Sequence, residues 1–255
     1  MRLITVGDVM VDVVSKRLPA PGEHAHGSVR LRAGGSAVNA ALTAAELGAS
    51  AQVVGRIGAD AAGELVVSTL EGNGIDAHLA RDEELPTGTA VALADAVIAD
   101  RGANALLSPP DLPSPLRADA LLVSGFALFQ EGSRDAARAA LDRFDGEWPA
   151  VDLASPRLAA LDFDAKVVFA TEAEAQSVPG LEERFEIVCV KRVDGARARR
   201  GGQVVDVASP PVARTSPFGA GDAFAATFLV ALASGEGLEA ALERACAAGA
   251  TAAGS

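Results

Sequence analysis

Short apolar runs alternate along this chain with longer stretches rich in alanine and leucine. The runs have the length of buried strands, whereas the longer stretches have the apolar spacing of helices. Strands separated by helices of this length predict β–α–β units, and therefore a parallel, doubly wound sheet with helices on both faces. The predicted strands are 3–6, 51–54, 120–123, 166–170 and 187–191, and the predicted helices are 37–47, 63–73, 133–144, 223–233 and 238–250.

Two segments break this rhythm, about 11–33 and 87–107. Both combine turn residues with short alternating patterns, such as Ser28-Val29-Arg30-Leu31-Arg32, which are typical of antiparallel strands with one covered face. We expect the two segments to pair into a small β-sheet lid beside the main sheet. The whole chain, 1–255, is then one domain.

Charge and composition exclude several classes of partner. The chain of 255 residues has a formal charge of -12, which repels a polyanion, so no nucleic-acid partner is expected. No uninterrupted apolar stretch of about 18 residues occurs, and we expect no membrane partner. Cys189 and Cys246 both lie in apolar patterns and are interpreted as buried free thiols, which favours a reducing, cytoplasmic location.

The strongest candidate site is Gly219-Ala220-Gly221-Asp222, which leads directly into a predicted helix. Two glycines allow a close approach of the backbone to a ligand, and a helix N-terminus attracts a phosphate group. The same field is expected to keep Asp222 ionised, ready to accept a proton from an attacking hydroxyl group. The alternative interpretation is a tight turn in which Asp222 is an ordinary helix cap.

A second glycine pair, Gly34-Gly35, opens another predicted helix, and Asn39 lies in its first turn. Asp12 follows the first predicted strand. In an open α/β sheet the carboxyl ends of the strands face the ligand crevice, so Asp12 and Asn39 are candidates for binding sugar hydroxyls. Helix capping by Asn39 and a solvated turn at Asp12 are the alternatives.

These motifs together resemble the ribokinase-like (PfkB) carbohydrate kinases over nearly the whole chain. The resemblance rests on motifs in the family's order: Gly7-Asp8 to Asp12, Gly34-Gly35 to Asn39, Gly55 to Asp60, Gly102-Ala103-Asn104 and Gly219 to Asp222. It implies a three-layer α/β/α Rossmann-like sandwich with a β-sheet lid. It also implies ATP-dependent phosphorylation of a sugar hydroxyl, with Mg²⁺. Because the predicted lid sheet has unpaired edges and an apolar face, we also expect two copies to pair through it into a homodimer.

The resemblance also implies a role for each matching residue. Asp222 is the expected catalytic base, and the amide groups of Gly219, Ala220 and Gly221 the expected anion hole. The expected acceptor-binding residues are Asp12, Gly34, Gly35, Asn39 and Asn104. The expected nucleotide-binding residues are Thr171, Lys191, Gly195, Gly219 and Gly221, and the expected metal ligand is Glu174.

The chain departs from the family pattern on the nucleotide side. Thr171 replaces the asparagine of the family's Asn-x-x-Glu motif, and Ser216 replaces an acidic residue, which argues against a monovalent-cation site. The loop 191–196 is short, and the sequence ends at Ser255, before the family's last nucleotide-side elements. A non-catalytic sugar-binding or regulatory protein of the same fold is therefore the main alternative to an active kinase.

Other classes fit less well. No G-x-x-x-x-G-K-[ST] motif occurs, the spacing of Gly55, Gly58 and Gly63 does not suit a dinucleotide, and His24 and His26 form only a weak metal motif.

For the acceptor that is phosphorylated, ribose is the best single prediction. A keto-deoxy sugar acid, a fructose-type sugar and a nucleoside stay open, with Arg101 as the only lid candidate for reading a carboxylate.

Overall fold

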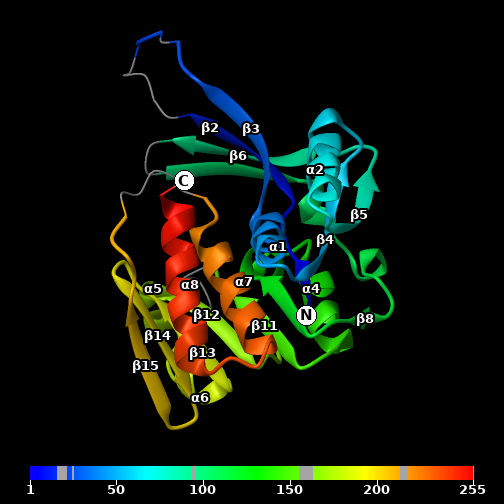
Figure 1. Ribbon diagram of the computed structural model, residues 1–255. Helices are drawn as coiled ribbons and strands as arrows, with labels where there is room; N and C mark the ends of the chain where they lie inside the picture. Colours follow the sequence, from blue (N-terminus) through cyan, green and yellow to red (C-terminus); the bar gives the residue numbers. More distant parts are fainter. Residues whose placement is uncertain (16–21, 25, 94–95, 155–162, 213–217, 255) are drawn as a thin grey trace.

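The computed structural model describes residues 1–255 apart from 16–21, 25, 94–95, 155–162, 213–217 and 255 (Figure 1). Its largest feature is a mixed sheet, whose central strands are parallel and whose last two strands are antiparallel. From edge to edge the strands are β15 (Gln203–Ala208), β14 (Gly195–Arg200), β13 (Ile187–Lys191), β12 (Val167–Thr171), β11 (Trp148–Asp152), β9 (Ala120–Ser124), β1 (Arg2–Val6), β4 (Ser50–Gly58) and β5 (Asp76–Asp82).

Helices cover both faces of this sheet. One apolar core joins the sheet to α1 (Ser36–Glu46), α2 (Ala61–Gly72), α7 (Ala220–Ala233) and α8 (Leu238–Ala253). The other core includes side chains from α3 (Gly125–Phe129), α4 (Arg134–Arg143) and α6 (Leu181–Arg184), beside the short α5 (Glu172–Ser177). Neighbouring residues of β1 enter opposite cores, Leu3 one and Ile4 the other, because successive strand side chains point to opposite faces. The predicted three-layer α/β/α sandwich is confirmed.

A second sheet has the strand order β3 (Val29–Gly34), β2 (Met10–Ser15), β6 (Thr87–Leu93) and β7 (Ala96–Gly102). It extends across one end of the main domain (Figure 1). Both segments predicted to form the lid therefore contribute strands, although the second ends in the 3₁₀ turn η1 (Ala103–Leu106). The remaining elements are the 3₁₀ turn η2 (Pro109–Asp111) and the small strand pair β8 (Leu116–Arg117) and β10 (Phe144–Asp145).

Hydrogen bonds from Asp60 connect the lid to the main domain. Its side chain caps α2 by accepting from the Gly63 amide at 2.8 Å, and it also accepts from the amide (2.8 Å) and the hydroxyl (2.6 Å) of Thr87, the first residue of β6. One carboxylate thus serves a helix end and a lid strand, which fixes where the lid strand begins.

Aromatic packing fixes the position of α7. Phe169 of β12 makes edge-to-face contacts with Phe224 and Phe228, with ring centroids 6.1 and 5.6 Å apart. Such pairs contribute about 0.5–1.5 kcal/mol each beyond their burial. Since α7 is also buried against α1 and α8 (Figure 1), its N-terminus is held firmly at the carboxyl end of the main sheet.

In the described part of the chain, no helix combines the length and apolar character that a membrane crossing requires. Cys189 and Cys246 are both free and buried, as expected from their apolar surroundings.

Candidate active site

The site is centred on the first turn of α7. Gly219 precedes this helix in a left-handed conformation, with φ of 83°, which favours glycine. Among the described residues, no side chain caps the helix here. The amide groups of Gly219, Ala220 and Gly221 at this helix start are thus available to bind an anion, with the positive end of the helix behind them. This is the geometry expected of an anion hole.

Asp222 lies in that first turn, and its Oδ2 accepts a hydrogen bond of 3.0 Å from the side-chain amide of Asn39 in α1. Burial raises the pKa of Asp222 to about 7, and the nearby Asp152 adds to the rise, although the Asn39 hydrogen bond opposes it. The expectation that the helix field keeps this carboxyl fully ionised therefore needs correction, because desolvation outweighs it. A carboxylate with a pKa near neutral pH is well suited to accept a proton from a hydroxyl group.

Asp12 lies on lid strand β2 and is 1% exposed, yet neither of its carboxylate oxygens has a hydrogen-bond partner among the described residues. Its carboxylate lies against Gly34, where an added Cβ would approach Oδ2 to 2.3 Å. Only glycine leaves room for it. Burial raises the pKa of Asp12 above its ordinary value, and the Arg32 cation opposes that rise. Buried, unpaired oxygens are costly, and they suit a ligand that supplies hydroxyl donors.

Gly35 is the N-cap residue of α1 and Asn39 lies in its first turn, as the sequence predicts. The side-chain nitrogen of Asn39 donates to Asp222, so Asn39 connects the acceptor side to the proposed base. An added Cβ at Gly219 would also lie 3.6 Å from the Asn39 side chain, which places the two glycine motifs next to each other.

The expected substrate contact of Asn104 needs correction. Its amide nitrogen donates to the carbonyl oxygens of Val9 (2.8 Å) and Arg101 (2.9 Å), and its oxygen accepts from the Val9 amide (2.8 Å). Asn104 is 2% exposed. Because the polar groups of its side chain bind backbone, Asn104 holds the connection from β1 to β2 against β7 instead of facing the acceptor.

An ion pair that the sequence did not reveal lies close to Asp222. The Nζ atom of Lys191 is 2.7 Å from both carboxylate oxygens of Asp152, which ends β11. A Cβ added to Gly221 would come within 3.3 Å of that Nζ atom, so the pair packs against the first turn of α7. Lys191 is thereby held beside the anion hole with its charge oriented by Asp152.

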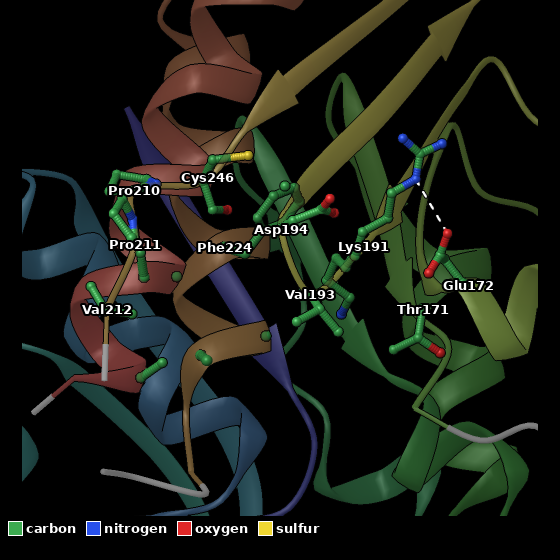
Figure 2. Close-up of a pocket in the computed structure, with 18 of the residues that line it drawn as sticks. Thr171, Glu172, Lys191, Val193, Asp194, Pro210, Pro211, Val212, Phe224 and Cys246 are labelled. Atoms are coloured by element: carbon green, nitrogen blue, oxygen red, sulfur yellow. Dashed lines mark ion pairs between the residues drawn. The ribbon is translucent and has the colours of Figure 1, made fainter. Parts of the chain in front are cut away.

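A cleft of about 870 Å³ opens on the other side of this turn. Figure 2 shows Pro210, Pro211 and Val212 on one side of it and Thr171 and Lys191 on the other. Its other lining residues come from the loop after β13, from α7 and from α8: Arg192, Val193, Asp194, Gly195, Ala220, Gly221, Phe224, Cys246, Gly249, Ala250 and Ala253, together with Glu172 and Ser209. The predicted nucleotide-side residues Thr171, Lys191, Gly195 and Gly221 thus share one cleft.

The loop 191–196 is a tight turn, closed by a hydrogen bond of 2.8 Å from the Arg192 amide to the Gly195 carbonyl. The short loop 191–196 therefore still leaves room for the 870 Å³ cleft that it lines. Ser216 lies outside the described residues.

Glu174 caps its own helix. Its Oε2 accepts from the Thr171 amide at 2.7 Å, and the Thr171 hydroxyl accepts from the Glu174 amide, so the two residues form a capping box at the start of α5. Across the described residues there is no cluster of three or more metal-ligating side chains. Mg²⁺ in nucleotide sites is commonly held by one or two carboxylates together with phosphates and water, so the Glu174 carboxylate, which binds the cleft-lining residue Thr171, is compatible with such a site.

Comparison with known proteins identifies the family. The sequence profile described as pfkB family carbohydrate kinase matches residues 2–255. The chain belongs to the pfkB family. It is a carbohydrate kinase, as its motifs indicate.

Relatives and solved structures agree with this membership. The chain is 30% identical to "ATP-dependent ribose-1-phosphate kinase" of Halopiger xanaduensis, over 100% of this chain and 92% of that protein. It is 27% identical to "5-dehydro-2-deoxygluconokinase" of Bacillus velezensis, over 94% of this chain and 85% of that protein. The structure of a "putative Ribokinase II in complex with ATP and Mg+2" from E. coli has a TM-score of 0.86, at 20% identity, over 100% of this chain and 93% of that one, which shows a shared fold.

Proposed function

We propose that this member of the family transfers the γ-phosphoryl group of ATP to a hydroxyl group of a small sugar, with Asp222 as the general base. The observation that carries the proposal is the position of Asp222. It lies at the uncapped N-terminus of α7, bound to Asn39 on the acceptor side and adjacent to the 870 Å³ cleft on the other side.

In the proposed reaction the acceptor hydroxyl lies beside Asp222. Its proton passes to the carboxylate as its oxygen attacks the γ-phosphorus, and the bond to the bridging oxygen breaks to release ADP. The amide groups of Gly219, Ala220 and Gly221 stabilise the charge on the transferring group. Asp12, Gly34, Gly35 and Asn39 hold the acceptor, and the unpaired oxygens of Asp12 receive its hydroxyl donors.

ATP occupies the 870 Å³ cleft in this proposal. Thr171, Lys191 and Gly195 contact it, with Lys191 supplying positive charge to the phosphates from its place beside Asp152. Glu174 would hold Mg²⁺ through its carboxylate, and the ion would neutralise part of the phosphate charge.

The names of the relatives differ in the acceptor, so the comparisons do not decide between ribose and the other acceptors considered above. The choice of ribose from the sequence rested on the family's usual acceptors and on Asp12 and Asn39 as ligands for a neutral sugar, with Arg101 as the only lid arginine considered. Arg32 lies next to Asp12, so a second lid arginine adjoins the proposed acceptor residues.

The test is release of ADP by the purified protein from ATP and Mg²⁺ against a panel of neutral sugars, sugar acids, sugar phosphates and nucleosides. We expect acceptor-dependent ADP release with at least one of them. Sugar binding in calorimetry with no ADP release from any acceptor would contradict the proposal and favour a non-catalytic sugar-binding protein.

We also propose a homodimer through the lid. Apolar side chains on strands β3 and β7 are exposed, with Val29 64%, Leu31 61% and Ile98 61% exposed, and edge strands readily pair with a second copy. Light scattering at micromolar protein should give twice the chain mass, and Leu31→Asp should lower it to that of a monomer. A monomeric mass for the unmodified protein would contradict this.

A further inference from the structure

Arg32 lies directly opposite Asp12 in the lid. The two residues are cross-strand partners in β3 and β2, so their side chains share one face of the sheet. The Nε atom of Arg32 is 3.4 Å from Oδ2 of Asp12. Asp12 therefore orients the Arg32 side chain beside the proposed acceptor site.

The guanidinium group of Arg32 also reaches the main domain. Its central carbon lies 5.6 Å from the ring centre of Phe218, the residue immediately before Gly219. A cation over an aromatic face is attracted by the ring. Arg32 thus spans from the lid to the loop that forms the anion hole.

A cleft of about 470 Å³ adjoins the reaction centre at this point. Asn39 and Gly219 line it, together with Arg32 and Phe218, and it continues between α1, α7 and α8. Asn39 binds Asp222 and lines this cleft together with Arg32, so a ligand that extends from the base into the cleft can contact Arg32. Glu46, an exposed acidic residue, lies among the other lining residues, so the favourable place for an anion is the Arg32 end.

Part of the Arg32 guanidinium group is open to a ligand. Its Nε atom is buried and faces Asp12, whereas the side chain as a whole is 41% exposed. A guanidinium carries five N–H donors in a planar fork, which matches the paired oxygens of a carboxylate or a phosphate. A neutral sugar offers no such pair of charged acceptors.

Arg101, the lid arginine expected from the sequence to read a carboxylate, is already engaged. It donates to both oxygens of the buried Asp8, at 2.6 to 3.2 Å, and to the Ser133 hydroxyl at 3.0 Å. This bidentate pair uses the donor fork that an anionic substrate would need. Arg32 is therefore the better placed of the two.

We propose that Arg32 binds an anionic group of the acceptor, a carboxylate or a phosphate remote from the hydroxyl that is phosphorylated. The acceptor class is then a sugar acid or a sugar phosphate rather than a neutral sugar. This inference rests on the proposed kinase function and assigns its substrate class.

The test compares acceptors that differ in their charged group: ribose 1-phosphate against ribose, and 2-keto-3-deoxygluconate against fructose. For each pair the ratio of kcat/KM is measured in the unmodified protein, in Arg32→Gln, in Arg32→Lys and in the control Arg30→Gln. Arg30 is an exposed arginine on the same strand. In each pair the ratio is kcat/KM for the anionic acceptor divided by kcat/KM for the neutral one. A higher ratio for the ribose 1-phosphate pair indicates a phosphate site, and a higher ratio for the 2-keto-3-deoxygluconate pair indicates a carboxylate site.

We expect the unmodified protein to prefer the anionic member of one pair. Arg32→Gln should lower that preference about 10- to 100-fold, because a charge-assisted hydrogen bond is lost. The preference of Arg32→Lys should lie between those of Arg32→Gln and the unmodified protein, and Arg30→Gln should keep the preference of the unmodified protein. A preference for the neutral member of both pairs would overturn the inference. So would an Arg32→Gln variant, folded by circular dichroism, that keeps the preference or loses both activities equally.

Calorimetric titration of the same acceptors without ATP separates this inference from the proposed function. If no acceptor supports ADP release but the anionic one binds in an Arg32-dependent manner, the kinase proposal fails and the anion site stands. If ADP release depends on an acceptor but not on Arg32, the kinase proposal stands and the anion site fails. If Arg32→Gln does not fold, Arg32→Lys decides, since it keeps a charge near Asp12 but lacks the planar fork.

Discussion

The two sides of Asp222 are built differently. On the acceptor side, a few polar groups have fixed orientations: the buried Asp12 lies against Gly34, and the partly buried Asn39 and Arg32 contact Asp222 and Asp12 respectively. The nucleotide side is a larger cleft whose walls include proline, valine, alanine and glycine (Figure 2). Lys191, fixed by Asp152, lies against the first turn of α7 on that side.

This difference teaches where specificity resides. Buried polar groups that lack a partner discriminate strongly, because a ligand that fails to pair them leaves their desolvation uncompensated. Apolar walls discriminate by shape, and each contact contributes little. We therefore expect large effects from single changes on the acceptor side and at the reaction centre, and small effects on the walls of the nucleotide cleft.

The largest effect is expected at the reaction centre. Asp222→Asn should lower kcat by about 10²–10⁴, because the group that accepts the hydroxyl proton is lost while the shape is kept. Acceptor binding, measured by calorimetry, should persist. Wild-type turnover in this variant would place the base elsewhere and leave Asp222 as a helix cap.

On the acceptor side, Asp12→Asn should raise the KM for the acceptor by roughly 10- to 100-fold, because hydrogen bonds to a charged oxygen are stronger than those to an amide. The KM for ATP should change little. Steady-state kinetics with each substrate varied in turn checks both. An equal rise in the two KM values would mean that the lid as a whole has been disturbed.

The Asp152–Lys191 ion pair is expected to influence the pKa of the proposed base, Asp222. Asp152 raises the pKa of Asp222 and Lys191 lowers it, so Asp152→Asn should move the acidic limb of the kcat/KM profile to lower pH and Lys191→Gln to higher pH. Opposite shifts cannot come from a general loss of structure. If the acidic limb has the same midpoint in both variants as in the unmodified protein, the pair does not influence the pKa of the base and contributes only to packing.

The smallest effect is expected on the apolar wall. Val193→Ala should raise the KM for ATP only roughly two- to fivefold, since Val193 is 81% exposed and ATP would cover its two methyl groups only in part, so that about one methylene-equivalent of contact is lost. Val204→Ala on β15, exposed but outside the cleft, is the matched control and should have no effect. A change of a hundredfold or more at Val193 would contradict the contrast between the two sides.

Much of this organisation was predictable because its signals are local. The glycine pairs before α1 and α7, each followed at once by a helix, indicate ligand-binding helix N-termini without knowledge of the fold. The lid segments were recognisable because their alternating pattern differs from the buried parallel strands. The basic run at 197–200 proved to be part of the β14–β15 hairpin, with Ala196 and Ala198 buried on its inner face.

What the sequence missed depends on contacts between distant residues. Strand β11 was not predicted, because Pro149 lies near the start of a short apolar run, where a proline normally argues against a strand interior. Asp152 ends that strand, so its pairing with Lys191, 39 residues away, was hidden as well. Its place at the carboxyl end of a strand is the signal that could have identified it.

The burial of individual polar side chains could not be predicted from the sequence pattern either. The pattern places Asp222 at a helix N-terminus and suggests a low pKa, but the packing of α7 removes water from the carboxyl group and raises the pKa to about 7. Likewise, the engagement of Asn104 with backbone groups depends on how β1, β2 and β7 meet, which no local motif encodes.

The most direct test of the central claim is the pH dependence of kcat/KM for the best acceptor. Because the base must be ionised, and because burial raises the pKa of Asp222 to about 7, the rate should rise with pH through an acidic limb near pH 7 and then level off. The residual activity of Asp222→Asn should lack that limb. A profile that is flat between about pH 5 and 8, or an Asp222→Asn variant that keeps the same limb, would contradict the assignment of Asp222 as the base.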